Sequence, residues 1–267
     1  DFQGNSIGLA PDGPGRTRIE VRSPIPTTST EAIGVADELM WILRLVSPGG
    51  LDTVAAWSRD QTAGCVQFDR VSRSLKHELV RAEFTDLFLV SAAGAWSRAS
   101  ASDQEVCRLA IDMLLGACNS NLETSIVLSA SALELIAEEW LPKAKGQYEV
   151  APAARAAIKA DLVAAAAQHA PGSEFARNAQ EIAGWLFNHT AKERFRRLQS
   201  HFGMPRDETL VDMVNVRNKV VHGGYQALPL DRKIEAMFFG RWMLAECLLR
   251  WLNSVGPPQD WGRFYSP

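Results

Sequence analysis

The strongest constraint on the fold is a succession of helical patterns that fills the chain from about residue 102 onward. Apolar side chains recur there every three or four residues, a spacing that gives each helix one apolar face. Glycine and proline separate the segments, because they end helices and form turns. We therefore predict an all-α bundle in this part of the chain. Its expected helices span residues 103–118, 121–141, 153–169, 174–187, 192–202, 207–222 and 230–255.

The first hundred residues have a different pattern, which predicts a smaller α+β region. The opening thirty are rich in Gly, Pro, Ser and Thr, so we expect loops there, apart from one strand candidate at residues 18–22. A helical pattern follows at residues 30–46. Two strand-like runs come next, at residues 53–58 and 65–69, and the apolar run at residues 84–90 is of ambiguous type.

The predicted fold class is mainly α, with a C-terminal helical bundle preceded by a small α+β N-terminal region. A length of 267 residues fits one large domain or two small ones. The change of pattern predicts an N-terminal region of unknown role at residues 1–100, which could form part of a larger domain. A helical domain is predicted at residues 101–256 and a tail at residues 257–267. Within the helical domain, the alanine-rich residues 153–169 are expected to pack weakly.

Charge and cysteine content argue against some classes of protein and some kinds of site. The 28 basic and 31 acidic residues give a net charge of −3, which argues against a non-specific nucleic-acid coat protein. The four cysteines (Cys65, Cys107, Cys118 and Cys247) form no C-x-x-C pair, so we expect buried free thiols, no metal site and a reducing, cytoplasmic compartment. No apolar run approaches the roughly 18 residues that a membrane span needs.

The start of the chain shows no targeting signal. No basic stretch followed by an apolar one occurs there, so no signal peptide is predicted. The chain also begins at Asp1 without an initiating methionine, which is compatible with a processed or excised piece of a longer protein.

The most informative polar residues lie at the end of the predicted helix at residues 207–222. Arg217, Asn218 and His222 follow its apolar positions, and Gly223 can adopt the left-handed conformation that ends a helix. Arg217 and His222 are about 140° apart on an ideal helix, and their side chains are long enough to converge on one cleft. The alternative is a pair of solvated side chains, with His222 bonding to the last carbonyl groups.

The segment RNKVVHGG (residues 217–224) resembles the signature of the HEPN superfamily, in which an Arg, often followed by Asn, His or Asp, precedes a His by a few residues. Upstream, SIVLSASALELIAEEWL (residues 125–141) is similar to an early helix of the same fold. AKERFRRLQSHFGM (residues 191–204) is similar to the helix before the signature in the ApeA-like branch. The resemblance covers residues 101–256, a little over half of the chain.

This resemblance implies a helical bundle with endoribonuclease activity that needs neither metal nor cofactor. The nucleophile would be the 2′-hydroxyl of the substrate, which RNA has and DNA lacks. Arg217 would bind phosphate oxygens, His222 would act as general acid or base, and Asn218 would orient His222 or bind a phosphate oxygen. Members of the superfamily commonly form homodimers in which two signatures share one cleft, and they often act in phage defence, toxin–antitoxin systems or stress responses.

Further residues are predicted to belong to the same candidate site. Glu134 is predicted either to hold Arg217 in place or to be an ordinary surface residue facing water. Residues 192–219 contain seven basic and four acidic side chains, which fits a wall facing RNA phosphates, although charged helix faces are often simply solvated. The predicted RNA-binding residues are Lys192, Arg194, Arg196, Arg197 and Lys219.

Two alternatives to a nuclease remain open at this stage. The helical domain could be a catalytically inactive HEPN module that dimerises or binds RNA or another ligand, with the N-terminal region sensing a partner. It could also act with a nucleotidyltransferase or an antitoxin as partner. No association with a membrane is expected. The accessibility of Arg217 and His222 to a phosphate would distinguish an enzyme from a binding module.

Overall fold

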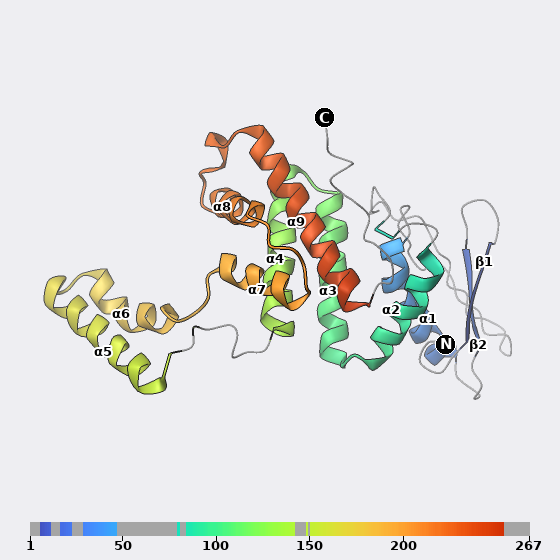
Figure 1. Cartoon of the computed structure of the whole chain (residues 1–267), viewed down its shortest axis with the longest axis horizontal. Coiled ribbons are helices and arrows are strands. Elements are labelled where there is room, and N and C mark those ends of the chain that lie inside the picture. Colours follow the sequence, from blue (N-terminus) through green and yellow to red (C-terminus); the bar gives the residue numbers. More distant parts are fainter. Residues whose placement is uncertain are drawn as a thin grey trace. The chain divides into compact units, whose positions relative to one another are not determined.

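The computed structural model describes residues 6–11, 17–22, 29–46, 79–80, 84–141, 148 and 150–253. Within these ranges the protein is mainly α, with nine α-helices and one two-stranded antiparallel sheet (Figure 1). Its contacts divide the chain into two units. The first unit comprises residues 1–136 and 207–267, and the second comprises residues 137–206. The domain boundaries inferred from the sequence stay predictions.

The small sheet lies at the start of the first unit. Strand β1 (Ser6–Pro11) pairs antiparallel with β2 (Thr17–Arg22), and Leu9 lies opposite Ile19. The strand candidate at residues 18–22 is thereby confirmed, whereas the loop expected over β1 is wrong. β1 alternates Ile7 and Leu9 with small residues, a strand pattern that the surrounding glycines and prolines obscured.

The ambiguous run at residues 84–90 is helical. It forms the beginning of α2 (Thr85–Arg98), whose buried face includes Phe88 and Trp96. The helix predicted at residues 30–46 is α1 (Ser29–Val46). The two strands predicted at residues 53–58 and 65–69 lie outside the described residues.

The remaining helices of the first unit follow the predicted pattern closely. They are α3 (Ala101–Cys118), α4 (Leu122–Trp140), α8 (Thr209–Val221) and α9 (Leu230–Trp251), with a short 3-10 turn, η3 (Tyr225–Ala227), before α9. The last turn of α4, from Ala137, belongs to the second unit. α9 packs against both α3 and α8 (Figure 1), and half of its length is buried, which makes it the central helix of the described part of this unit.

Gly240 of α9 allows α4 and α8 to approach that helix at one level. A Cβ atom placed on Gly240 of α9 would lie 3.1 Å from Cβ of Ser129 on α4 and 3.8 Å from Cγ of Met213 on α8. Nearby, buried Arg241 donates hydrogen bonds to Oγ of Ser125 (2.8 Å) and to the carbonyl oxygen of Ala117. The Arg241 bonds tie α9 to α4 and α3, and the close approach at Gly240 adds α8.

The second unit contains α5 (Pro152–His169), α6 (Glu174–Trp185) and α7 (Ala191–His201). Ser173 caps α6 and Thr190 caps α7, each by accepting a hydrogen bond from a backbone N–H in the first turn. Helices α5 and α6 pack on each other through alanines, and Ala166 is the one buried residue in α5. The weak packing predicted for residues 153–169 is confirmed.

Candidate functional site

The candidate site begins where α8 ends. The backbone N–H of His222 donates to the carbonyl oxygen of Asn218 (2.9 Å), and that of Gly224 donates to the carbonyl oxygen of Lys219 (2.9 Å). Gly223 has a φ of 84°, the left-handed conformation that closes a helix at low cost for glycine. His222 is therefore the residue that caps the C-terminus of α8, as the glycines predicted.

Arg217 is bound by two side chains. Its Nη2 lies 3.1 Å from Oε2 of Glu134 on α4, a residue 83 positions earlier in the chain. Its Nη1 donates to Oδ1 of Asn218 at 3.2 Å. The Arg217 and Glu134 side chains are 23% and 26% exposed, so the ion pair lies at the edge of the protein with access to solvent.

The guanidinium of Arg217 retains donors for a further acceptor. Its Nε has no hydrogen-bond partner among the described residues, but it is buried, so a ligand cannot reach it and the available donors are on the two Nη atoms. A guanidinium also carries more N–H groups than the contacts with Glu134 and Asn218 use. Because Glu134 holds the group in one orientation, the remaining donors are preorganised for an oxyanion at this position.

The packing of three helices explains why Glu134 reaches Arg217. Ser129 and Glu134 belong to the same helix, and Ser129 is fixed against Gly240 of α9. Met213, which approaches the same glycine, precedes Arg217 by one turn of α8. α9 thus fixes α4 and α8 relative to each other within the first unit.

His222 differs from Arg217 in its surroundings. It is exposed, as are Asn218 and Lys219 on the preceding turn. Within the described part of the chain, no hydrogen bond or ion pair holds its imidazole, so the ring can rotate to meet a substrate atom.

The predicted RNA-binding residues fall into two groups. Lys219 is exposed on α8 in the first unit, and the other four lie on α7 in the second unit. The four α7 residues are partly exposed, and Lys192 and Arg194 lie within one turn of buried Phe195 and Leu198 respectively. Arg197 pairs with Glu193 at 3.4 Å. The four residues on α7 are Lys192, Arg194, Arg196 and Arg197.

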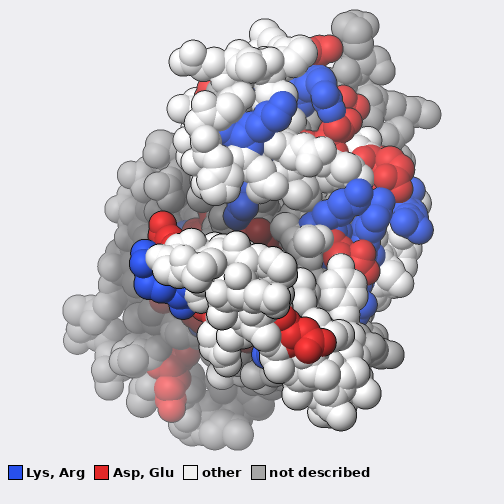
Figure 2. All heavy atoms as spheres, turned by 90° about the vertical axis from the view of Figure 1, so that its left-hand side faces the viewer, with Lys and Arg blue, Asp and Glu red and all other residues white. Residues whose placement is uncertain are grey.

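Charges of both signs mix on the visible face of the molecule. In Figure 2, Lys and Arg side chains lie beside Asp and Glu in several places, with uncharged side chains between them. This face carries no unbroken basic surface. Any binding of RNA here would therefore depend on particular contacts more than on a general positive field.

The residues that support the site carry little signal in the sequence. The junction of the helices is formed by Ser129, Gly240 and Arg241. The structural role of a small residue in one helix can be recognised only when the helix that packs against it is known. The signal that could have pointed to Gly240 is a glycine inside a long helical pattern. Glycine destabilises a helix by about 1 kcal/mol relative to alanine, so its presence there indicates that close packing requires it.

Two of the described cysteines are buried thiols of low reactivity. Cys107, Cys118 and Cys247 are buried, whereas Cys65 lies outside the described residues. Burial raises the pKa of the Cys107 and Cys247 thiols far above their ordinary value, so both remain protonated and poorly nucleophilic.

The described ranges contain no group of three or more His, Cys, Asp or Glu side chains that could hold a metal ion. None of the helices in these ranges is long and apolar enough to cross a membrane. In comparisons with known proteins, no family model, no curated protein and no solved structure matches this chain.

Proposed function

We propose that this protein is a metal-independent endoribonuclease of the HEPN type, with Arg217 and His222 in its active site. The observation that supports the proposal most directly is the contact between Arg217 and Glu134. It joins two segments that resemble HEPN sequences independently, residues 125–141 and 217–224, at a polar position with access to solvent. An arginine held in this way is preorganised to bind a phosphate oxygen.

The proposed reaction is a transesterification within the RNA. The 2′-oxygen attacks the adjacent phosphorus, the bond from phosphorus to the 5′-oxygen breaks, and a 2′,3′-cyclic phosphate and a 5′-hydroxyl result. The proton leaves the 2′-hydroxyl and another proton reaches the departing 5′-oxygen, so a base and an acid are both required. His222 takes one of these roles, and Arg217 stabilises the negative charge on the non-bridging oxygens.

A symmetric homodimer supplies the second role. An isologous pair places the end of α8 from each protomer at one dyad, so that a second His222 completes the acid–base pair. Loop or single-stranded RNA is the substrate class, because the nucleotide must be free to bring its 2′-oxygen in line with the leaving group. A role in phage defence, in a toxin–antitoxin system or in a stress response fits this activity, with an antitoxin or nucleotidyltransferase as a partner.

The test is cleavage of RNA by the purified protein in the presence of EDTA. We expect cleavage that is unaffected by the chelator and leaves cyclic phosphate and 5′-hydroxyl ends. A matched substrate with 2′-O-methyl groups should be inert, because its 2′-oxygen cannot lose a proton. An Arg217→Ala/His222→Ala double variant, purified in parallel, identifies any contaminating nuclease.

Two results would count against the proposed nuclease. Equal cleavage by the wild type and the double variant would assign the activity to a contaminant. Wild-type protein that binds single-stranded or structured RNA without cutting it would favour the alternative, a catalytically inactive HEPN module that binds RNA or dimerises.

Replacement of Glu134 by glutamine tests whether this carboxylate positions Arg217. Glutamine has nearly the same shape but lacks the charge that holds the guanidinium, so cleavage should fall by about tenfold. The ion pair is partly exposed, so the free energy of unfolding should change by only about 1 kcal/mol or less. Cleavage rate and urea denaturation are measured on the same preparation. An unchanged cleavage rate would show that Glu134 has no positioning role.

A further inference from the structure

The outer side of α6 carries large apolar side chains that the second unit leaves exposed. Three of them, Phe175, Ile182 and Leu186, are seven and four positions apart, which places them within about 40° of one another on a helix. Leu186 follows the last residue of α6 but keeps a helical conformation. Trp185 lies at the edge of this line. Together the four side chains, which are 37–67% exposed, form a surface that we call the α6 stripe.

The inner side of the same helix is made of small residues. Ala179 and Ala183 are the buried residues of α6, and Ala166 is the one buried residue of α5. The two helices therefore pack on each other through alanines, which bury little apolar area. Small apolar side chains inside and large ones outside are typical of a helical pair that packs against a further partner.

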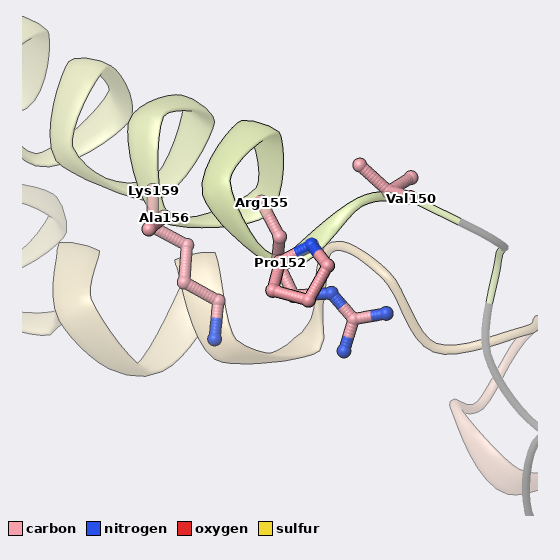
Figure 3. Close-up of a pocket in the computed structure, with 5 residues that line it drawn as sticks. All are labelled: Val150, Pro152, Arg155, Ala156 and Lys159. Atoms are coloured by element: carbon pink, nitrogen blue, oxygen red, sulfur yellow. The ribbon is translucent and has the colours of Figure 1, made fainter.

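The aromatic residue that follows the stripe is covered within the second unit. The guanidinium carbon of Arg155 lies 5.1 Å from the centroid of the Phe187 ring, and Nζ of Lys159 lies 6.0 Å from it. Figure 3 shows both side chains leaving α5 on the same side, beside a pocket of about 320 Å³. Phe187 is buried, whereas Trp185 and Leu186 just before it are 67% and 50% exposed, so this cover does not extend to the stripe.

The exposed area of the α6 stripe fits one side of a dimer interface. A large side chain presents roughly 150–250 Å² when it is fully exposed, so the stripe exposes on the order of 400 Å². Two copies packed stripe to stripe would bury on the order of 800 Å² of apolar surface. A stable interface of about 1,600 Å² is about 57% apolar, which is roughly 900 Å². The stripe thus supplies nearly all the apolar area that a stable dimer needs.

The charges of α6 do not suit RNA or an anionic membrane. The charged residues of this helix are Glu174, Arg177 and Glu181, and all three are exposed. RNA and acidic lipid both require an excess of lysine or arginine beside the apolar contacts. A mixture of both signs fits the polar rim of a protein–protein interface, where charged side chains stay in water.

We propose that the α6 stripe is the contact surface for a second copy of this chain. A two-fold axis places the same stripe on both sides, so one contact covers the exposed apolar residues of both copies. The stripe spans about three helical turns, a length that lets two α6 helices pack side by side. The proposed nuclease also requires two copies, but this inference does not depend on cleavage.

The test compares Ile182→Glu with Leu109→Glu by sedimentation equilibrium of the full-length chain. Ile182 belongs to the stripe and is 37% exposed, whereas Leu109 lies on α3 in the first unit and is 42% exposed. Glutamate is a good helix former, so both variants should fold, and circular dichroism checks that they do. Only Ile182→Glu would bury a carboxylate without a partner in the proposed dimer.

We expect the wild type to be a dimer at about 10 µM, and Ile182→Glu to raise its dissociation constant at least about 100-fold, because the symmetry introduces the charge twice. Leu109→Glu should change the dissociation constant by no more than about twofold. The inference is overturned if the wild type is a monomer at up to about 100 µM. It is also overturned if Ile182→Glu dimerises like the wild type, or if the two variants weaken the dimer equally.

Hydroxyl-radical footprinting of Trp185 locates the contact. The indole is 67% exposed in a single copy, so its oxidation should be several-fold slower in the wild-type dimer than in Ile182→Glu. Equal oxidation in the two proteins would overturn the inference even for a dimeric wild type, because the interface would then lie elsewhere.

A failure of this test is distinguishable from a failure of the proposed nuclease. Sedimentation needs no RNA and no activity, so a dimer that buries the stripe is detected even where no RNA is cut. Conversely, cleavage in EDTA by a protein whose Trp185 stays exposed would support the nuclease and remove α6 as its dimer contact.

Discussion

Replacing Arg217 by alanine is expected to reduce RNA cleavage by about 100-fold or more, because one preorganised donor to the developing oxyanion is worth that much. Arg217→Lys should keep the positive charge but remain at least about tenfold below the wild type. A lysine has no planar fork, so it cannot contact Glu134, Asn218 and a phosphate oxygen together. Single-turnover cleavage rates at saturating enzyme separate this effect from weaker binding of RNA.

The matched control for this prediction is Arg232→Ala. Arg232 on α9 pairs with Asp212 on α8, so it is also an ion-paired arginine of the first unit, but it stands outside the candidate site. Its loss should leave the cleavage rate within about twofold of the wild type, since an exposed ion pair contributes little to stability. Equal losses in the two alanine variants would contradict a specific role for Arg217.

Replacing His222 by alanine should lower cleavage by about 100-fold or more, the usual contribution of a general acid or base. The side chain is exposed at the end of α8, so its removal should not change the thermal stability by more than about 1–2 °C. Cleavage of an RNA with a 5′-thio leaving group gives a sharper readout. That group departs without protonation, so rescue by it would identify His222 as the general acid.

His169→Ala serves as the control for the loss of a histidine. His169 is exposed in the last turn of α5, an environment similar to that of His222 but in the second unit. The variant should cleave at the wild-type rate. A wild-type rate in His222→Ala itself would remove this residue from the mechanism and leave the helix cap as its only role.

The helices were predictable because their pattern is local. Apolar spacing and Gly or Pro breaks predicted α8 and α9 to within a few residues of their observed ends. β1 was missed because a strand of six residues carries a weak signal, and its partner β2 is what stabilises it. The type of the run at residues 84–90 was ambiguous for a similar reason: its few apolar residues fit either period.

The candidate site was predictable only in part. The spacing of Arg217 and His222 before two glycines predicted a polar cluster at the end of α8, because helix termination is a local property. Glu134 had two possible environments in the sequence. The contact with Arg217 joins residues 83 positions apart, and it depends on how α4 and α8 pack on α9.

The sequence by itself determined the helical class, the end of α8 and the residue types at that end. Each of these depends on neighbours within a few positions, through backbone hydrogen bonds and apolar periodicity. Only the tertiary structure decided that Glu134 faces Arg217, and that Arg155 and Lys159 share the ring of Phe187. Those contacts depend on which helix faces pack against each other. Close packing at residues such as Gly240 determines this, and local sequence patterns do not encode it.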